Sequence, residues 1–344
     1  MIKIASFYII DAVMENINRY AIIDLHLHLD GSLSPEAIIK VANEENIELP
    51  TKNPQELKSF LAVPKDCDSL NEYLKRFDIP NYVLQTEYGL KTCYCDLIRR
   101  LAEDGLKYVE VRMAPQLSTQ KGLSQNEVVH ILCEATQDAE IMFGLKSNLI
   151  LCMMRGDNTH KANLETIEVA KEHLGHGVVA MDLAGAEALF TNENFKEEFA
   201  LINKYKIPFT IHMGEALGPE SIESGLVYNP NRIGHGVRAI ENPKLVDFLV
   251  EKRIPLELCP TSNLDTKAVK SIEDLPIKYY LEKGIKVTIN TDDMTVSDTT
   301  LKKEFELLTK IGVTEEEMKT IALNSIDAAF ISEQEKEELR KLVL

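Results

Sequence analysis

The chain has 344 residues, an apolar fraction of 44% and a formal net charge of −17 at neutral pH. This composition is typical of a globular protein, and the length allows one large domain or two small ones. The acidic balance argues against the positive surface of a nucleic-acid binder and disfavours capture of highly phosphorylated substrates.

The first residues contain a short apolar run, 4–10, which Asp11 interrupts. The run is too short to span a membrane and lacks the basic start and cleavage site of a signal peptide. We therefore expect residues 1–13 to be an N-terminal extension. Residues 14–344 are expected to form a single domain, because no Pro- or Ser-rich linker divides them. Six scattered cysteines are typical of free thiols in a cytoplasmic protein.

Eight apolar runs rich in Val and Ile alternate with segments of helical periodicity. We expect strands at 20–29, 108–115, 146–155, 178–187, 207–215, 232–238, 255–263 and 286–293, and helices at 124–143, 163–173, 243–252 and 277–283. Alternating strands and helices indicate a parallel sheet with crossover helices. Eight such strands predict an α/β fold, the (β/α)₈ TIM barrel, whose chemistry lies at the C-terminal ends of the strands.

Histidine and acidic residues stand at the ends of four of these runs. His26 and His28 are two residues apart on one strand, so they face the same way. His212, His235 and the pair Asp292 and Asp293 end three later strands. Burying polar or charged side chains at the end of an apolar strand costs free energy unless these groups are paired or bound to metal. The sequence therefore predicts a metal site for a borderline ion such as zinc.

Other histidines and cysteines serve as comparisons. His173 and His176 precede a strand, at the opposite rim of the barrel, and are interpreted as capping or surface residues. His130 and His160 are interpreted as structural. Cys93 and Cys95 share a predicted helix, where residues two apart do not face each other, so we expect no metal there.

Five motifs together resemble the adenosine deaminase family of the amidohydrolase superfamily. They are HLHLDG (26–31), DLAGAE (182–187), HMGE (212–215), GHG (234–236) and NTDD (290–293), and the resemblance extends over most of the chain, from 20 to 342. The stretch ALNSIDAAF (322–330) is similar to the last barrel helix of that family.

The resemblance implies one zinc ion per chain and a set of site residues. The metal ligands would be His26, His28, His212 and Asp292. The catalytic residues would be Glu215, which protonates N1 of a purine, with His235 and Asp293 orienting the attacking water. The substrate-binding residues would be His28, Asp30, Gly185 and Asp293, with the Gly185 N–H close to the purine N3.

Asp30 bears most on the substrate. In nucleoside-acting members of the family this residue is Asp and reaches the ribose 5′-hydroxyl, whereas relatives that take the free base carry Glu. The resemblance thus implies zinc-dependent hydrolytic deamination of adenosine and 2′-deoxyadenosine to inosine and deoxyinosine plus ammonia, in purine salvage. AMP is disfavoured. Met294 and Ala114 depart from the family pattern at the rim of the pocket, and they leave 5′-modified adenosines (methylthioadenosine, aminofutalosine) open, with adenine a lesser alternative.

Two other classes of protein remain as alternatives. A hydrolase of the wider superfamily acting on a lactam or ester would use two metals bridged by a Lys, but no Lys stands at the end of the 178–187 strand. A barrel that only binds nucleosides is disfavoured, because every zinc ligand and the acid are present. The compact deaminase fold is excluded, since neither H-x-E nor P-C-x-x-C occurs. The sequence predicts a small-molecule nucleoside partner, no nucleic acid and no membrane, and leaves the oligomeric state open.

The segment 57–84 is long for a loop and contains a helical stretch, 70–77. It resembles the helical lid that covers the ribose in this family, so extra helices are expected over the C-terminal face of the barrel. Ordinary barrel packing is the alternative interpretation of this segment.

Overall fold

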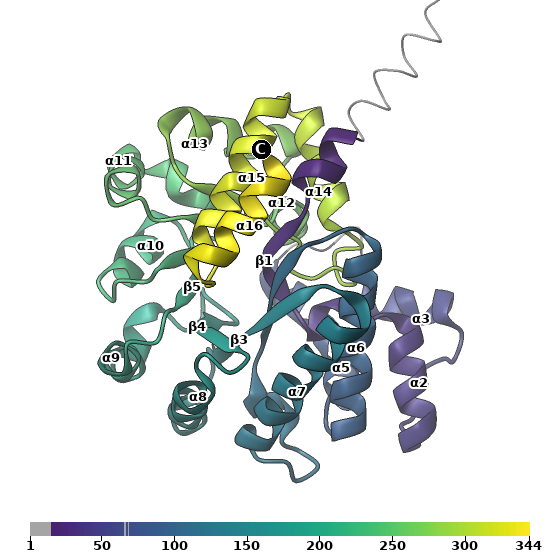
Figure 1. Ribbon diagram of the computed structural model, residues 1–344. Helices are drawn as coiled ribbons and strands as arrows, with labels where there is room; N and C mark the ends of the chain where they lie inside the picture. Colours follow the sequence, from purple (N-terminus) through teal and green to yellow (C-terminus); the bar gives the residue numbers. More distant parts are fainter. Residues whose placement is uncertain (1–14, 65–66, 68) are drawn as a thin grey trace, which may run out of the picture.

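The computed structural model describes residues 15–64, 67 and 69–344, so the predicted extension 1–13 lies outside the described residues. Eight parallel strands alternate with helical segments along the described chain (Figure 1). The strands are β1 (Ile23–His28), β2 (Tyr108–Met113), β3 (Lys146–Met154), β4 (Val178–Ala184), β5 (Thr210–Met213), β6 (Arg232–His235), β7 (Leu256–Leu258) and β8 (Val287–Ile289).

The strands close into a barrel. They form two four-stranded ladders in sequence order, β1 to β4 and β5 to β8. Single parallel bridges join the ladders at both seams, Leu27 with Asp292 and Met181 with Phe209. The predicted (β/α)₈ fold is therefore confirmed. Because all eight strands run in the same direction, their C-terminal ends lie together at one end of the barrel, where the chemistry of this fold is expected.

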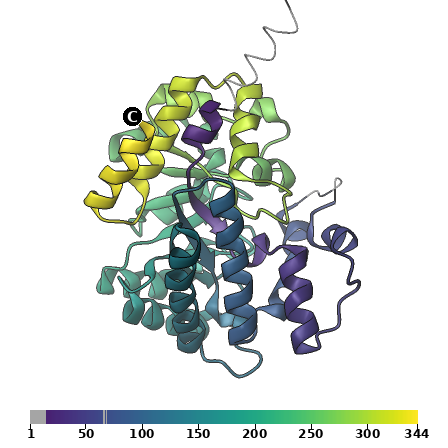
Figure 2. The same cartoon turned by 45° about the vertical axis from the view of Figure 1, so that its right-hand side comes forward.

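Helices surround the barrel and cover one end of it (Figures 1 and 2). The α-helices are α2 (Pro35–Glu45), α3 (Pro54–Leu61), α4 (Leu70–Tyr73), α5 (Asp78–Val83), α6 (Glu87–Glu103), α7 (Gln125–Phe143), α8 (His160–His173), α9 (Lys196–Tyr205), α10 (Pro219–Leu226), α11 (Pro243–Lys252), α12 (Pro260–Asp265), α13 (Ile277–Lys283), α14 (Leu301–Lys310), α15 (Glu315–Ala328) and α16 (Glu333–Val343). Short 3₁₀ helices are η1 (Asp30–Ser32), η2 (Leu74–Phe77), η3 (Pro115–Ser118), η4 (Asn192–Phe195), η5 (Val237–Glu241) and η6 (Ile272–Asp274).

The helix limits follow from capping chemistry. At the start of α7, Ser124 and Glu127 form a reciprocal capping box, and Gly144 ends the helix in the left-handed region at φ 68°. After α8, Gly175 likewise has φ 80°, as expected of a residue that follows a helix at the rim opposite the strand ends.

One predicted strand is partly wrong. The run 255–263 forms only the three-residue strand β7, and its second half is the helix α12. Pro260 is the reason, because it lacks an N–H for a sheet ladder but fits the first turn of a helix. The other runs each contain a strand, though β5, β6 and β8 are only three or four residues long.

Ionic groups fill the middle of the barrel. Arg112 on β2 and Arg232 on β6 are both buried, and both contact the carboxylate of Glu257 on β7. Arg232 also donates to Glu110 at 2.6 Å, and Arg112 lies 3.2 Å from Asp182. Buried charges persist only when they are paired in this way. The network lies directly beneath the strand ends that carry the predicted metal ligands.

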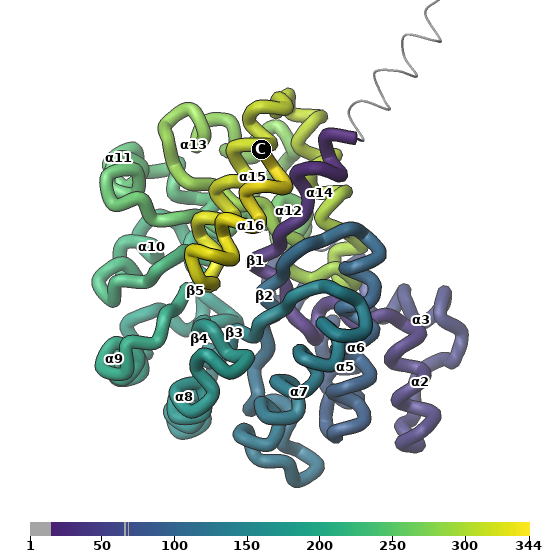
Figure 3. The backbone as a smooth tube through the Cα atoms, in the orientation of Figure 1, coloured from purple at the N-terminus to yellow at the C-terminus, as the bar shows by residue number. Residues whose placement is uncertain are grey.

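The ends of the described chain lie side by side. The helices α15 and α16 run beside the first described residues, as the tube in Figure 3 shows. Arg19 donates to the backbone carbonyl of Leu344 at 3.2 Å. Helix α15 also packs against β1 and β8, so the C-terminal helices cover the seam where the barrel closes.

None of the helices in residues 15–64, 67 and 69–344 combines the length and the apolar character that a membrane span requires.

Candidate functional site

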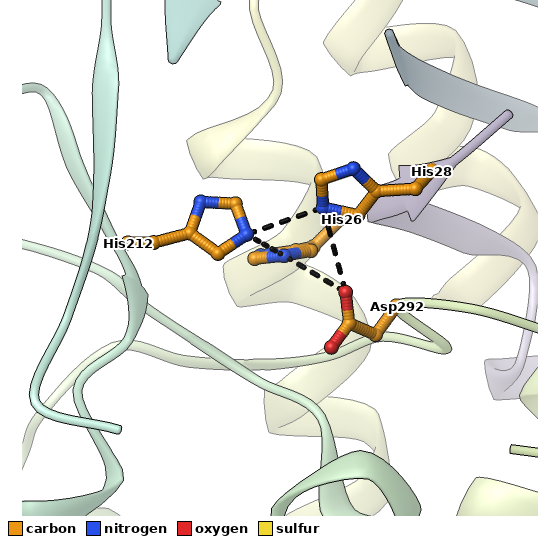
Figure 4. Close-up of side chains that lie close together, drawn as sticks. All are labelled: His26, His28, His212 and Asp292. Carbon is orange, nitrogen blue, oxygen red and sulfur yellow. Dashed lines mark hydrogen bonds and ion pairs between the residues drawn. The ribbon is translucent and has the colours of Figure 1, made fainter. Parts of the chain in front are cut away.

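The four predicted metal ligands converge at one end of the barrel (Figure 4). His26 and His28 come from β1, His212 comes from β5, and Asp292 follows β8. Nε2 of His212 lies 3.0 Å from Nε2 of His26 and 3.1 Å from Nε2 of His28. Oδ1 of Asp292 lies 3.3 Å and 3.5 Å from the same two His Nε2 atoms. Ligands about 2.0–2.1 Å from a tetrahedral ion lie roughly 3.3 Å apart, so this cluster matches a single zinc-sized cation.

Carboxylates behind the histidines explain why their nitrogens face one another. Nδ1 of His26 lies 2.9 Å from Oε2 of Glu257, and Nδ1 of His212 lies 2.8 Å from Oδ2 of Asp182. A carboxylate accepts the Nδ1–H and so leaves the Nε2 lone pair bare. Two such lone pairs at 3.0 Å repel each other unless a proton or a metal ion lies between them. The residues present therefore fit a bound metal ion.

The backbone at the barrel seam holds two of these ligands in place. The N–H of Asp292 donates to the carbonyl of His26 at 2.8 Å, and the N–H of His28 donates to the carbonyl of Asp292 at 2.7 Å. Asp292 has φ 60°, and His235, which ends β6, has φ 59°. Non-glycine residues rarely adopt this left-handed conformation, and it is enriched at functional sites.

His235 lies beside the metal cluster. Its Nε2 is 3.6 Å from Oε2 of Glu215 and 3.8 Å from Oδ2 of Asp292. Its Nδ1 lies 3.1 Å from Nδ2 of Asn263 on α12. Burial holds the pKa of His235 well below its ordinary value, so the ring is neutral at neutral pH. A neutral imidazole whose inner nitrogen accepts from Asn263 presents Nε2–H to the pocket.

Glu215 follows β5 and is buried. It accepts a hydrogen bond from the Thr266 hydroxyl at 3.0 Å. Burial, together with the negative charges of Asp292 and Glu187, raises the pKa of Glu215 well above its ordinary value. The side chain is therefore suited to carry a proton near neutral pH, as a general acid must.

Glu187, after β4, fixes the turn that carries Glu215. Its carboxylate accepts four consecutive backbone N–H groups, those of Gly214, Glu215, Ala216 and Leu217, at 2.7–3.2 Å. Glu187 is 1% exposed, and these hydrogen bonds compensate for its burial.

Asp293 packs between two segments far apart in the chain. Its Oδ2 accepts from the Tyr73 hydroxyl at 3.0 Å. Its Oδ1 lies against Gly31, where an added Cβ would be 1.6 Å from that oxygen, so only glycine fits at position 31. Burial, reinforced by the charges of Asp292 and Asp30, raises the pKa of Asp293 well above its ordinary value.

A cavity of about 290 Å³ joins these groups. Asp30 and Gly185 line it together with His28, His212, Glu215, His235, Asp292 and Asp293. Oδ1 of Asp30 is buried and has no hydrogen-bond partner within the described part of the chain, and burial raises the pKa of Asp30 to about 6. Gly185 has φ 103°, a conformation that favours glycine. A more open cavity of about 690 Å³ adjoins it, and both are lined by Leu70, Ala186 and Glu215.

The structure thus brings every predicted site residue to one place, with His26 buried directly behind the cavity lining. The histidines interpreted as structural lie elsewhere, for example His160, which is ion-paired with Glu198 at 2.8 Å. All six cysteines are free thiols, as predicted. Sequence reasoning missed the supporting residues Glu187, Glu257, Asn263 and Tyr73. Only Glu187 had a signal, as the last residue of the 182–187 motif.

Comparison with known proteins gives consistent matches over this chain. The adenosine deaminase family model matches residues 22–344. An adenosine deaminase of Haemophilus ducreyi is 47% identical over 326 residues, which cover 93% of this chain and 95% of that protein. Among solved structures, an adenine deaminase from Arthrobacter aurescens has a TM-score of 0.85 at 29% identity, covering 94% of this chain and 97% of that one. An N6-methyl-AMP deaminase from Arabidopsis thaliana has a TM-score of 0.81 at 25% identity, covering 96% and 98%.

Proposed function

Because this chain belongs to the adenosine deaminase family, we propose that it deaminates adenosine and 2′-deoxyadenosine by hydrolysis, releasing ammonia, and that its metal is zinc. The cluster of His26, His28, His212 and Asp292 supports one metal ion per chain. Nitrogen and carboxylate ligands in a tetrahedral arrangement suit zinc. When bound there, zinc would act as a Lewis acid that makes a water molecule nucleophilic at neutral pH.

Glu215 is the proposed acid. Addition of water at C6 makes that carbon tetrahedral and removes the aromaticity of the six-membered ring, so N1 must gain a proton as the new bond forms. The raised pKa of Glu215 keeps a proton on its carboxyl group, and the hydrogen bonds to Glu187 hold the turn behind it. The protonated carboxyl gives its proton to N1, and the resulting carboxylate then takes a proton from the oxygen that has added to C6 and passes it to the amine, which leaves as ammonia.

His235 and Asp293 are proposed to hold and orient the attacking water beside the metal ligands. The neutral ring of His235 presents Nε2 to the cavity, and Asp293 has one oxygen without a partner there. Both groups have fixed positions before substrate arrives, which lowers the reorganisation needed in the transition state. The Gly185 N–H is proposed to approach the purine N3, where the missing side chain permits close contact.

Asp30 carries the proposal for a nucleoside as substrate. It is a buried carboxylate with an unpartnered oxygen in the same cavity as the reacting groups, so it needs a donor such as the ribose 5′-hydroxyl. Its charge would repel a 5′-phosphate. Arg155, the basic residue lining this cavity, already donates to Phe190, Asn192 and His212. AMP is therefore a poor substrate in this proposal.

The test compares substrates that differ at the 5′ position. Zinc-loaded protein is assayed by absorbance with adenosine, 5′-deoxyadenosine, methylthioadenosine, AMP and adenine. Adenosine should react fastest, and Asp30→Ala should lower kcat/KM for adenosine by about a hundredfold or more while changing it little for 5′-deoxyadenosine. Asp78→Ala, an exposed carboxylate at the same pocket, is the control. Exclusive turnover of methylthioadenosine or adenine would overturn the assignment of adenosine.

A cytoplasmic location is part of the same proposal. Six free cysteines, five of them buried, suit a reducing compartment. The formal charge of −17 gives no support to a nucleic-acid partner.

A further inference from the structure

Three short helices lie over the cavity that contains the reacting groups. They are α4, η2 and α5, residues 70–83, called here the covering segment. Leu70, Leu74 and Phe77 from this segment line the cavity with their apolar side chains. Tyr73 lines it too, but it ends in a polar hydroxyl, and it is only 2% exposed.

The Tyr73 hydroxyl has two partners, both on the loop after β8. It lies 3.0 Å from Oδ2 of Asp293 and 2.9 Å from Oγ of Ser297. A tyrosine hydroxyl has one proton and can also accept. When the Tyr73 hydroxyl donates its hydrogen bond to Oδ2 of Asp293, the Ser297 hydroxyl donates to the Tyr73 oxygen, so the Tyr73 hydroxyl both donates and accepts.

These contacts leave the two oxygens of Asp293 unlike each other. Oδ2 is held by Tyr73, whereas Oδ1 is buried and has no hydrogen-bond partner among the described residues. Gly31 packs directly against Oδ1, so the carboxylate cannot swing in that direction. The side chain is thus fixed by one hydrogen bond and one steric contact, and its second oxygen has no hydrogen-bond partner among the described residues.

We propose that Tyr73 is a positioning residue for the deamination: its hydroxyl fixes the Asp293 carboxylate in the orientation that the reaction needs. This inference rests on the proposed function, and Tyr73 acts through Asp293 without touching the reacting atoms. The covering segment then has a second role besides excluding water, because it completes the catalytic arrangement when it is in place.

The packing around Tyr73 supports the link between covering and positioning. Tyr73 forms a small apolar cluster with Cys67 and Val296, which follows Asp293 by three residues. The N–H of Val63 donates to the carbonyl of Val296 at 2.9 Å. The covering segment is therefore joined to the loop that carries Asp293 by the hydroxyl and ring of Tyr73, and the preceding residue Val63 adds a backbone hydrogen bond to the same loop.

Tyr73→Phe tests the proposal, because it removes only the hydroxyl and keeps the buried ring. In zinc-loaded protein we expect kcat for adenosine to fall by about tenfold, the scale of one hydrogen bond to a charged group, with KM nearly unchanged. Tyr82→Phe is the matched control, since Tyr82 lies on the same covering segment and is 54% exposed. Its kcat should equal that of the wild type.

A double variant separates positioning from a merely structural role. If Tyr73 acts through Asp293, then Tyr73→Phe should cause little further loss of kcat in an Asp293→Asn background. The proposal would be overturned if the kcat losses of the two single variants multiplied in the double variant, or if Tyr73→Phe had wild-type kcat and only a raised KM. Tyr73 would then only cover the cavity. Because each comparison is made against measured wild-type turnover, a wild-type protein inactive on adenosine would instead count against the proposed function.

Discussion

Glu187 accepts the backbone N–H of Glu215 at 3.2 Å, and the same carboxylate accepts the N–H groups of the residue before and the two residues after. The two acids come from neighbouring strands, β4 and β5. Glu187 accepts hydrogen bonds from these backbone N–H groups, and its negative charge, added to burial and the charge of Asp292, favours the protonated form of Glu215.

Glu187→Gln should therefore impair the reaction without removing the metal. The amide nitrogen of Gln cannot accept an N–H, so at least one backbone donor is left unpaired. We expect kcat to fall by about ten- to a hundredfold, the scale of one or two charge-assisted hydrogen bonds. Loss of the Glu187 charge lowers the pKa of Glu215, so the alkaline limb of the kcat profile should move to lower pH.

Steady-state kinetics across pH, with metal content measured in parallel, check this result. Glu220→Gln is the control, because Glu220 also accepts a backbone N–H, from Gly218, but is exposed and lies in the first turn of α10. An unchanged alkaline limb in Glu187→Gln would show that the carboxylate only holds the backbone.

Asp182→Asn should weaken metal binding. Despite its burial, the pKa of Asp182 is held far below its ordinary value by His212 and Arg112, so the side chain is an anion that accepts from the His212 ring. Outer carboxylates of this kind change metal affinity by about 10–100-fold. Competition with a chelator measures the affinity, and Asp138→Asn on the exposed face of α7 is the control. Equal affinity in the two variants would contradict this role.

Arg112→Met should destabilise the whole barrel. The guanidinium is fully buried and compensates both Glu257 and Asp182. Its removal leaves Asp182 without an Arg partner and Glu257 with Arg232 alone, and breaking a buried ionic network in this way costs about 3–5 kcal/mol of unfolding free energy. The exposed pairs of Arg99 with Asp96 and Glu103 provide the comparison, and Arg99→Met should cost less than about 1 kcal/mol. Urea unfolding measures both, and similar midpoints would show that the interior network tolerates a neutral side chain.

Glu304→Gln should stabilise the protein at alkaline pH. Glu304 is buried, and burial raises its pKa from 4.5 to about 7. Because the folded-state pKa lies above the unfolded one, the stability associated with the protonated form is complete below pH 4.5 and is lost as pH rises through 7. At pH 8 the wild type should therefore be less stable than the variant by about 3 kcal/mol, a difference that vanishes in acid.

Glu304 accepts from the Thr261 N–H and from the Thr299 hydroxyl. The amide oxygen of Gln can keep the first hydrogen bond, and its NH2 group can donate to the Thr299 oxygen if that hydroxyl turns. Thermal unfolding at pH 5 and pH 8 gives the measurement, and Glu282→Gln on the surface of α13 should show no such difference. A variant less stable than wild type at pH 8 would mean that the ionised carboxylate is favoured in the fold.

The metal ligands were predictable because each stands at the end of an apolar strand. In a parallel barrel all such ends lie on one face. The prediction of eight parallel strands therefore placed His26, His212 and Asp292 close together. The alternation along β1 placed His28 beside His26 without any knowledge of the tertiary structure.

The supporting residues were not predictable, since their roles depend on contacts across the chain. Tyr73 and Asp293 are 220 residues apart, and no periodicity links them. Glu257 lies in a short apolar strand. Nothing in the sequence of that strand indicates that Glu257 pairs with two arginines, one on β2 and one on β6. The stretch 255–263 was predicted as one strand because it is apolar. Its second half is a helix instead, because Pro260 favours the first turn of a helix over a strand.

The hydrogen bonds between His26, His28 and Asp292 at the seam have a consequence for how the protein is made. The ligand set includes residues from the first strand and from the loop after the last one, so a partial chain that ends before Asp292 lacks one of the four ligands. The ion can be captured with full affinity only after synthesis has passed Asp292 and the barrel has closed. Metal loading in the cell would then follow completion of the chain, and a truncated product could not compete for the ion.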